Sequence, residues 1–364
     1  MKYTSTRDKG VSVDSAVAIT AGISAEGGLF VPLALPTLSL EEIGSLAKLD
    51  YIEKAKKILK LFLTDFTEEE IDACAKGAYG SGSFSDEKVA PLVKIKDSLH
   101  VLELWKGPTS AFKDMALQIL PHLLSVASKK TAPGIEIVIL VATSGDTGKA
   151  ALEGFKDVEG TKILVFYPDE GVSPMQKLQM ATQEGANVSV CSIEGNFDDA
   201  QSGVKRIFTD PTIKEKLSRG NKMFSSANSI NWGRLVPQII YYFAAYAELL
   251  EKAEIKLGDK INFVVPTGNF GNILAAYYAK EMGLPVNKLI CASNANNVLT
   301  DFINTGLYDR RRDFYATSSP SMDILISSNL ERLLFALSGE DDTLISGLMK
   351  DLNEKGFYEV DKNI

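Results

Sequence analysis

Histidine, cysteine and long apolar runs are scarce in this chain of 364 residues, and each scarcity excludes a class of chemistry. The two histidines, His100 and His122, have no serine, cysteine or carboxylate at a suggestive local spacing, so we expect neither a zinc site nor a Ser-His-Asp triad. The three cysteines are scattered, which argues against a disulfide framework and is typical of a reducing compartment; they are Cys74, Cys191 and Cys291. Any proton chemistry should therefore belong to a lysine, a carboxylate or a cofactor, and no metal is expected.

Net positive charge is also absent, because 39 lysines and arginines face 47 aspartates and glutamates and leave a net charge of −8. Nucleic-acid binding depends on basic side chains that neutralise phosphates, so the acidic balance argues against it. No apolar run approaches the ~20 residues that a membrane-spanning helix needs. The segment from Met1 to Thr4 lacks the apolar core of a signal peptide. We therefore expect a cytoplasmic globular protein without a membrane or nucleic-acid partner.

Apolar strand-like runs alternate with amphipathic helical segments beyond residue 95. The expected strands are Val101–Trp105, Ile135–Ala142, Lys162–Tyr167, Val188–Ile193, Ile261–Pro266 and Leu289–Ser293. The expected helices are Phe112–Lys129, Thr147–Phe155, Pro174–Glu184, Asp198–Phe208, Leu235–Lys252, Ile273–Met282 and Val298–Asn304. This alternation predicts parallel sheets covered on both faces, and hence an α/β fold.

Three regions follow from this pattern. Residues 1–95 should be largely helical, with helices over Leu40–Ala47, Tyr51–Leu63 and Glu68–Ala78. Residues 96–235 and 236–364 should form two open, mostly parallel α/β blocks, separated by a loop-rich section. Near the end of the chain, Thr343 to Lys355 has a helical pattern and Gly356 to Val360 has that of a strand.

Lys113 lies where an expected strand gives way to a helix, the place where open α/β sheets bind ligands. A lysine is costly to bury, so an inward lysine at such a junction is either ion-paired or chemically employed. The alternative is a surface lysine paired locally with Asp114 or Glu103. Position alone favours that alternative.

Three further loops carry polar residues that suit anions. Glycine and hydroxyl residues follow the strand at Ile135–Ala142, and a Gly-rich loop follows the strand at Ile261–Pro266. Amides, hydroxyls and Arg234 lead into the helix that begins near residue 235, and an arginine fork matches phosphate or carboxylate. An ordinary turn or N-cap explains each loop taken alone.

Taken together and in this order, the segments resemble the threonine synthase family, pyridoxal-phosphate enzymes of fold type II with a tryptophan-synthase-β-like fold. The resemblance covers nearly the whole chain, from Ser5-Thr6-Arg7 and the segment from Glu26 to Pro32 to the segments from Ser321 to Ile324 and from Ser327 to Arg332. Its most specific part is Gly107-Pro108-Thr109 followed by Phe112-Lys113-Asp114. The resemblance therefore overrides the surface interpretation of Lys113.

The resemblance also implies roles for individual residues. Lys113 matches the lysine that binds pyridoxal 5'-phosphate covalently, and Asp146 should lie near the ring hydroxyl of the cofactor. The loop that cradles the cofactor phosphate corresponds to Gly268, Asn269, Phe270, Gly271 and Asn272. The substrate carboxylate loop corresponds to Thr143, Ser144, Gly145, Asp146 and Thr147, and the substrate phosphate pocket to Asn228, Ser229 and Arg234.

The implied reaction converts O-phosphohomoserine and water to L-threonine and phosphate by elimination and β-hydration. Another fold type II activity, such as threonine dehydratase, and a non-catalytic phosphometabolite-binding α/β protein remain alternatives. Both a monomer and a homodimer are compatible with the sequence. Family members continue beyond the segment that matches Ser327 to Arg332, so the resemblance predicts a shortened chain with weak or absent cofactor binding and little turnover. The alternative is a natural short variant with a rebuilt site, which would bind the cofactor and turn over substrate. No residue matches the hydroxyl group that contacts the pyridine nitrogen.

Overall fold

A four-stranded parallel sheet forms the centre of the first α/β block in the computed structural model, which describes residues 1–80, 82–143, 145–169, 172–195 and 197–361. Its strand order is β8-β7-β6-β9, with β6 (Glu136–Ala142), β7 (Thr161–Pro168), β8 (Val188–Ile193) and β9 (Lys222–Ser225). Residues 137–141 of β6 are all buried, as expected for an inner parallel strand covered on both faces. The predicted parallel sheet is confirmed.

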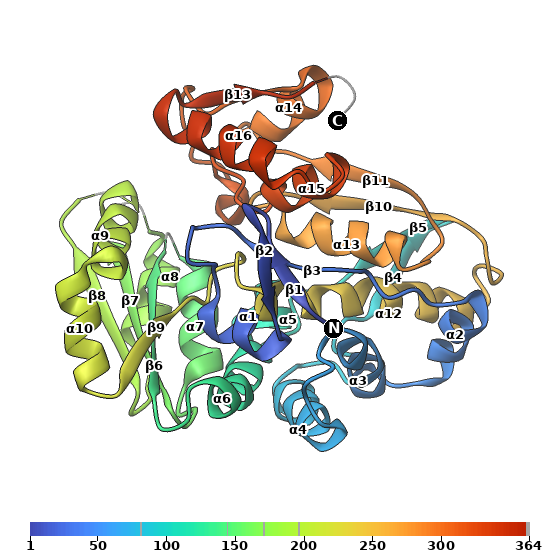
Figure 1. The fold of residues 1–364 in the computed structure, drawn as a ribbon. Helices are drawn as coiled ribbons and strands as arrows, with labels where there is room; N and C mark the ends of the chain where they lie inside the picture. Colours follow the sequence, from blue (N-terminus) through green and yellow to red (C-terminus); the bar gives the residue numbers. More distant parts are fainter. Residues whose placement is uncertain (81, 144, 170–171, 196, 362–364) are drawn as a thin grey trace.

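Helices cover both sides of this sheet. Figure 1 shows α9 (Phe197–Thr209) and α10 (Pro211–Arg219) to the left of the sheet and α6 (Leu120–Thr131) and α7 (Asp146–Phe155) to its right. The short helix α8 (Pro174–Ala181) packs against α7. Because β6 runs directly into α7, the loop after residue 142 lies at the carboxyl edge of the sheet.

The second block contains the parallel pair β10 (Ile261–Pro266) and β11 (Val286–Ala292), connected by α13 (Gly271–Glu281). Before it come α11 (Trp232–Leu235) and α12 (Pro237–Glu251). All but the last two of the 15 residues of α12 are buried, because this helix packs against α13 on one side and against N-terminal helices on the other. A helix that is apolar all round is typical of such a central position.

The N-terminal region is helical as predicted and adds a small sheet that the pattern did not predict. Its helices are α1 (Ser15–Ala21), α2 (Leu40–Ser45), η1 (Leu46–Lys48), α3 (Tyr51–Phe62) and α4 (Glu68–Tyr79). Capping boxes begin two of them, from Ser39 to Glu42 in α2 and from Thr67 to Glu70 in α4. The sheet has the antiparallel order β2-β1-β3, with β1 (Tyr3–Ser5), β2 (Asp8–Val13) and β3 (Phe30–Pro32).

The C-terminal part packs over the second block and confirms the helix and strand expected there. Its elements are α14 (Val298–Thr305), β12 (Leu307–Asp309), η2 (Pro320–Met322), α15 (Leu330–Leu337), α16 (Asp342–Glu354) and β13 (Phe357–Glu359). Strands β12 and β13 pair antiparallel, and the rings of Tyr308 and Tyr358 stack across them with centroids 5.1 Å apart. The division of the chain at residues 95 and 235 stays a prediction.

Two local expectations were wrong. The run Val101–Trp105 is not a parallel strand, because β5 (Leu99–Leu102) pairs antiparallel with β4 (Leu92–Lys96) through a two-residue turn in which Asp97 has a φ of 36°. The expected helix Phe112–Lys129 is interrupted into α5 (Asp114–Leu117) and α6, since Pro121 lies in the first turn of α6 and a proline favours a helix start.

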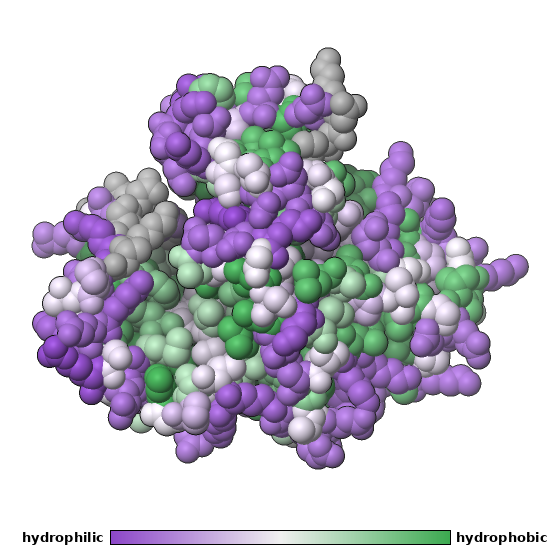
Figure 2. All heavy atoms as spheres, in the orientation of Figure 1, coloured by the Kyte–Doolittle hydropathy of each residue, from purple (hydrophilic) through white to green (hydrophobic). Residues whose placement is uncertain are grey.

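A continuous hydrophobic core joins residues from all three regions. On the face that Figure 2 shows, apolar residues gather over the middle of the molecule, and polar residues cover α16 above it. None of the helices in the described ranges is both long and apolar enough to cross a bilayer. No group of three or more histidine, cysteine or carboxylate side chains suited to a metal was found in the same part of the chain.

Gly154 permits the close contact between α7 and α5, and this contact generates a prediction. A Cβ added at Gly154 would lie 2.0 Å from the carbonyl oxygen of Leu117, so Gly154→Ala must push the two helices apart. We expect a loss of about 1–3 kcal/mol in the free energy of unfolding, measured with urea. The control Gly347→Ala in α16, where a Cβ meets nothing within 4 Å, should instead stabilise the protein by about 0.5–1 kcal/mol. Equal stabilisation by both variants would contradict the packing argument.

Candidate active site

Lys113 lies immediately before α5 and is buried, with 8% of its surface exposed. Its Nζ atom is 2.8 Å from Oδ1 of Asp146, which lies in the first turn of α7. The local surface pairing considered for Lys113 is therefore wrong. Asp114 makes its hydrogen bonds elsewhere, and Glu103 forms an ion pair with Lys106.

The loop before Lys113 is fixed by hydrogen bonds to the buried carboxylate of Asp114. This carboxylate is fully buried and accepts hydrogen bonds from the backbone N–H of Thr109 at 2.9 Å and from its hydroxyl at 2.7 Å. Gly107 is needed for this arrangement, because a Cβ there would lie 2.4 Å from the Cβ of Asp114. The Gly-Pro-Thr and Lys-Asp parts of the motif thus form one packed unit that fixes the position of Lys113.

Burial and charge act against each other on the buried ion pair. Burial lowers the pKa of Lys113 below that of an ordinary lysine, and the nearby charge of Arg234 lowers it further, whereas Asp146 raises it. Burial alone would raise the pKa of Asp146, but the ammonium of Lys113 and hydrogen bonds from Lys113 and Ser321 hold it below its usual value. The geometry therefore favours an ionised Asp146 beside an amine that gives up its proton more readily than usual.

The loop before α7 is folded around one hydroxyl group. The Oγ1 atom of Thr143 accepts hydrogen bonds from the backbone N–H of Gly145 at 3.0 Å and of Gly148 at 2.9 Å. Gly145 has a φ of 149°, and a Cβ there would collide with the side chain of Gln176. The N–H of Thr147 donates to Asp146 at 2.9 Å. Of the five residues predicted here, Ser144 lies outside the described residues.

Arg234 brings a buried positive charge to the same region. Its side chain is nearly inaccessible, and Nη1 donates to the carbonyl oxygen of Ala227 at 2.8 Å. Its Nε atom is buried without a hydrogen-bond partner among the described residues. Burial lowers the pKa of Arg234 to about 10, while the charge of Asp146 raises it. A buried cation with an unused donor is what an anionic ligand requires.

The Gly-rich loop predicted to hold a phosphate leads into α13 through strained backbone. Phe270, the residue before the helix, has a φ of 65°, which is uncommon for a residue other than glycine. The carbonyl oxygen of Gly268 accepts a hydrogen bond from the hydroxyl of Ser327 at 2.6 Å. Gly271 faces Ser229, since a Cβ at Gly271 would lie 3.4 Å from that of Ser229. The side chain of Asn272 turns back and donates to Pro266.

The structure thus brings most of the predicted residues into two groups. Lys113, Asp146 and Arg234 form the first, and the loop at 268–271 with Ser229 forms the second. Asn228 is exposed, and no side-chain hydrogen bond to another described residue ties it to either group. The roles of all these residues stay predictions.

Three residues close to these groups received no role from the sequence. The hydroxyl of Ser321 donates to Oδ2 of Asp146, Ser327 donates to Gly268, and the backbone N–H of Asn329 donates to the carbonyl oxygen of Asn269 at 3.0 Å. All three lie in the two C-terminal segments that carried the family resemblance. The many polar residues of these segments could have indicated a functional role, but they did not indicate which loops the segments contact.

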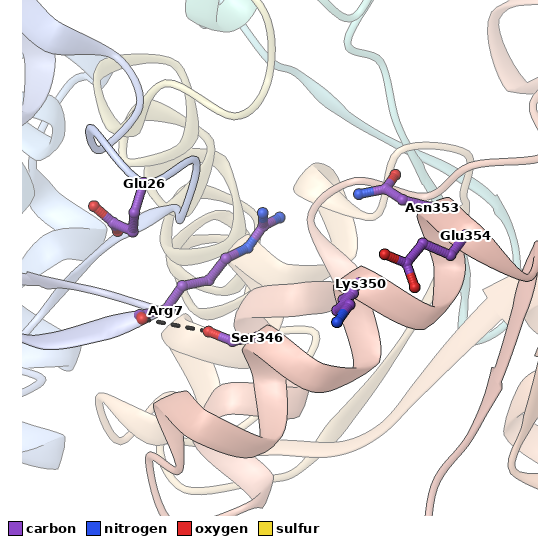
Figure 3. A pocket seen from close by; sticks show the side chains of 6 residues that line it. All are labelled: Arg7, Glu26, Ser346, Lys350, Asn353 and Glu354. Carbon is purple, nitrogen blue, oxygen red and sulfur yellow. Dashed lines mark hydrogen bonds between the residues drawn. The ribbon is translucent and has the colours of Figure 1, made fainter.

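Two cavities lie apart from Lys113. One has a volume of about 360 Å³. It lies between the N-terminal region and α16 and is lined by the residues labelled in Figure 3, which are Arg7, Glu26, Ser346, Lys350, Asn353 and Glu354. The other, of about 530 Å³, borders α3 and α12. Neither is lined by Lys113, Asp146 or Arg234, so the chemistry of the side chains, rather than cavity size, identifies the site.

Comparison with known proteins agrees with this geometry. A family model described as the threonine synthase N terminus matches residues 2–79, and one described as a pyridoxal-phosphate dependent enzyme matches residues 87–344. Threonine synthase from Pseudomonas aeruginosa is 40% identical over 362 residues, which cover 99% of this chain and 74% of that protein. The human protein threonine synthase-like 1 is 42% identical over 355 residues, 95% of this chain and 47% of that protein. The chain therefore spans about half the length of the threonine synthase-like relatives it matches.

A solved structure has the same fold over the full length of this chain. It is that of pyridoxal-phosphate-bound threonine synthase from Brucella melitensis, with a TM-score of 0.91 and 40% identity, and the match covers 75% of that protein. The α/β fold expected from the sequence is confirmed, and so is the family resemblance. With two adjoining family models and relatives at about this identity, the chain belongs to the threonine synthase family of pyridoxal-phosphate-dependent enzymes.

Proposed function

We propose that this chain acts as a threonine synthase, which converts O-phosphohomoserine and water to L-threonine and phosphate with pyridoxal 5'-phosphate as cofactor. The observation that carries the proposal is a buried amine paired with a carboxylate, with a buried guanidinium in the same region. Lys113 contacts Asp146 at 2.8 Å, and Arg234 lies close enough for its charge to act on both. Membership of the family supports the same conclusion.

The residues present fit the cofactor at both of its ends. Burial lowers the pKa of the Lys113 amine, so more of it is in the neutral form that reacts with an aldehyde. At the other end, the first turn of α13 would offer N–H groups and the positive end of a helix dipole to the cofactor phosphate. Met322 packs closely against this loop, since a Cβ at Gly268 would lie 3.3 Å from the Cα of Met322. Glycine there keeps the loop open to a ligand.

When bound, pyridoxal phosphate supplies the electron sink for the α carbon of the substrate, which no side chain provides. Lys113 would hold the cofactor at rest and, once released, carry the α proton on Nζ. Asp146 keeps a negative charge beside that amine and itself receives a hydrogen bond from Ser321. Because neither histidine has a serine, cysteine or carboxylate at a suggestive local spacing, Lys113 is the natural proton carrier.

Substrate binding would use the two polar loops around the lysine. Thr143, Ser144, Gly145 and Thr147 would hold the substrate carboxylate, and Asn228, Ser229 and Arg234 its phosphate. The unused Nε–H of Arg234 is the donor that this phosphate would take. In the reaction, the bond between the γ carbon and the phosphate oxygen breaks, and water contributes its oxygen to the β carbon. Arg234 would thus favour departure of the phosphate.

The remaining features of the proposal follow from the family and from composition. The partner is a small phosphorylated amino acid, without a nucleic acid or membrane, and the location is cytoplasmic. Residues 96–235 would carry the lysine and the carboxylate loop, and residues 236–364 the cofactor phosphate loop. Either a monomer or a homodimer accommodates this arrangement.

Replacing Lys113 is the first test. Incubation of the wild-type chain with pyridoxal phosphate should produce cofactor absorbance that survives dialysis, and phosphate release from O-phosphohomoserine should follow. Lys113→Ala should lose the dialysis-resistant absorbance and more than about 100-fold of the turnover, because no other amine takes its place. The matched control Lys149→Ala removes a lysine of α7 that pairs with Glu153 and should leave both properties nearly unchanged. Cofactor uptake without phosphate release would instead support a non-catalytic binding protein.

Arg234 is expected to separate substrate binding from cofactor binding. Arg234→Ala removes a charged donor from the proposed phosphate pocket, so kcat/KM for O-phosphohomoserine should fall roughly 10- to 100-fold, since a hydrogen bond to a charged group contributes about 1.5–3 kcal/mol. Uptake of pyridoxal phosphate should change less than threefold. Arg311→Ala, which breaks an exposed pair with Asp309, serves as the control. Unchanged kinetics in Arg234→Ala, or comparable turnover of unphosphorylated threonine, would favour the dehydratase alternative.

Asp146→Asn should shift the pH dependence of cofactor uptake in a defined direction. The carboxylate raises the pKa of Lys113, so its neutralisation lowers that pKa and makes the reactive neutral amine available at lower pH. The midpoint of the uptake rate against pH should therefore move to lower pH. Asp351→Asn, which disrupts only a surface pair with Lys355, should leave the midpoint in place. A shift to higher pH would show that Asp146 does not act on Lys113 as proposed.

A further inference from the structure

Arg332 connects three segments that are far apart in the sequence. It lies in the first turn of α15, is fully buried, and uses all three of its nitrogen atoms as donors. Nε donates to the carbonyl oxygen of Phe30 at 3.0 Å, and Nη2 to that of Ile230 at 2.6 Å. Nη1 donates to Oδ1 of Asn329 at 2.5 Å. These hydrogen bonds of Arg332 all go to amide and peptide oxygens, so its charge orients polar groups of the protein.

The bond to Asn329 determines which way that side-chain amide faces. With Oδ1 held by Arg332, the Nδ2 group is left to donate, and it does so to the hydroxyl of Ser229 and to the carbonyl oxygen of Asn269, each at 3.1 Å. The backbone N–H of Asn329 reaches the same carbonyl oxygen at 3.0 Å. One buried side chain thus contacts both the proposed cofactor phosphate loop and a residue of the proposed substrate phosphate pocket.

Holding the carbonyl of Asn269 has a consequence for the next residue. In a planar trans peptide the C=O and the following N–H point in opposite directions. Because two donors of Asn329 hold the carbonyl oxygen, the N–H of Phe270 faces away from Asn329. Phe270 also has a φ of 65°, a conformation that persists only where its surroundings enforce it.

We propose that Arg332 is a positioning residue for recognition of the cofactor phosphate, acting through Asn329 to hold the Asn269–Phe270 peptide in the orientation that binds this phosphate and to fix Ser229 beside it. Arg332 itself does not contact a ligand. The inference rests on the proposed function for the identity of the ligand, but it concerns how the loop at 268–271 is held. It places the control of the phosphate site on a helix outside both predicted binding loops.

A neighbouring ion pair provides a matched control. Arg7 donates to Glu331 through Nε at 2.8 Å and Nη2 at 2.7 Å, so it also ties the N-terminal region to the first turn of α15. It borders the cavity in Figure 3 and makes no contact with Asn329 in the structure. Arg7→Lys therefore perturbs the same helix and the same inter-segment junction without disturbing the Asn329 amide.

The experiment compares pyridoxal phosphate with pyridoxal, which lacks the phosphate. Absorbance titration of the wild-type chain with each compound gives two dissociation constants, whose ratio measures phosphate recognition apart from turnover. Arg332→Lys offers one ammonium in place of a three-way fork, and we expect the preference for the phosphorylated compound to fall about tenfold. Asn329→Ala should have a similar effect, and the double variant should lose little more, because both substitutions break the same chain of contacts. Arg7→Lys should keep the ratio within about threefold, as expected of a site that does not share partners with Asn329.

Each outcome decides between the claims. If the wild type prefers the phosphorylated compound and both substitutions keep that preference, the positioning role is wrong and the proposed function stands. If Arg332→Lys weakens both compounds equally, Arg332 only maintains the fold and the inference is again overturned. If Arg332→Lys fails to fold, as judged by circular dichroism and thermal unfolding, the ratio for Asn329→Ala decides alone. A wild-type chain that binds neither compound overturns the proposed function, and the inference with it.

Discussion

The burial of the Lys113 ammonium against Asp146 is the interaction on which the rest of the site depends. A lysine inside a protein is unfavourable unless a partner compensates for lost water, and here the compensation comes from a different loop and a different strand-helix unit. Both partners need support to remain in place. Asp114 fixes the loop before the lysine by accepting a hydrogen bond from Thr109. Ser321, in the C-terminal part, donates to the oxygen of Asp146 that does not contact Lys113. The ion pair therefore couples segments that would otherwise be separate surface loops.

Glycines and strained backbone occur where these segments approach one another most closely. A side chain at Gly107 would clash with Asp114, and one at Gly145 would clash with Gln176. A side chain at Gly154 would clash with the backbone of Leu117, so glycine there lets α7 pack closely against α5. Phe270 adopts a left-handed conformation although it is not a glycine. Unfavourable backbone of this kind persists when surrounding contacts over-determine it, and at Phe270 the contacts come from Asn329 through the preceding carbonyl. The close packing and the strain thus have one cause, the convergence of several chain segments on one small volume.

The N-terminal region takes part in this convergence, although none of its residues was predicted to bind substrate or cofactor. Thr6 and Arg7 donate to the buried carboxylate of Glu331, and the carbonyl of Phe30 receives the guanidinium of Arg332. Two consecutive residues of α15 therefore hold the N-terminal sheet, and the second of them also holds Asn329. The family model for the N terminus and that for the cofactor-binding part consequently describe one folded unit with a shared core.

Local pattern determined much of the fold and the chemical character of the site. Alternating apolar runs were enough to predict the parallel sheets and most helices, and motif order was enough to indicate the family and Lys113. Pattern failed at residues 101–105 and 112–129, because an antiparallel partner and a proline in the chain decided those local structures. Taken alone, the sequence around Lys113 favoured a surface position, since burial depends on an aspartate 33 residues away. The positions of Ser321, Asn329 and Arg332 also depend on distant residues. The sequence showed that they lie in segments rich in polar residues, but only the tertiary structure decided which loops they hold. Hydrogen bonds between distant segments leave no periodic signal in the sequence.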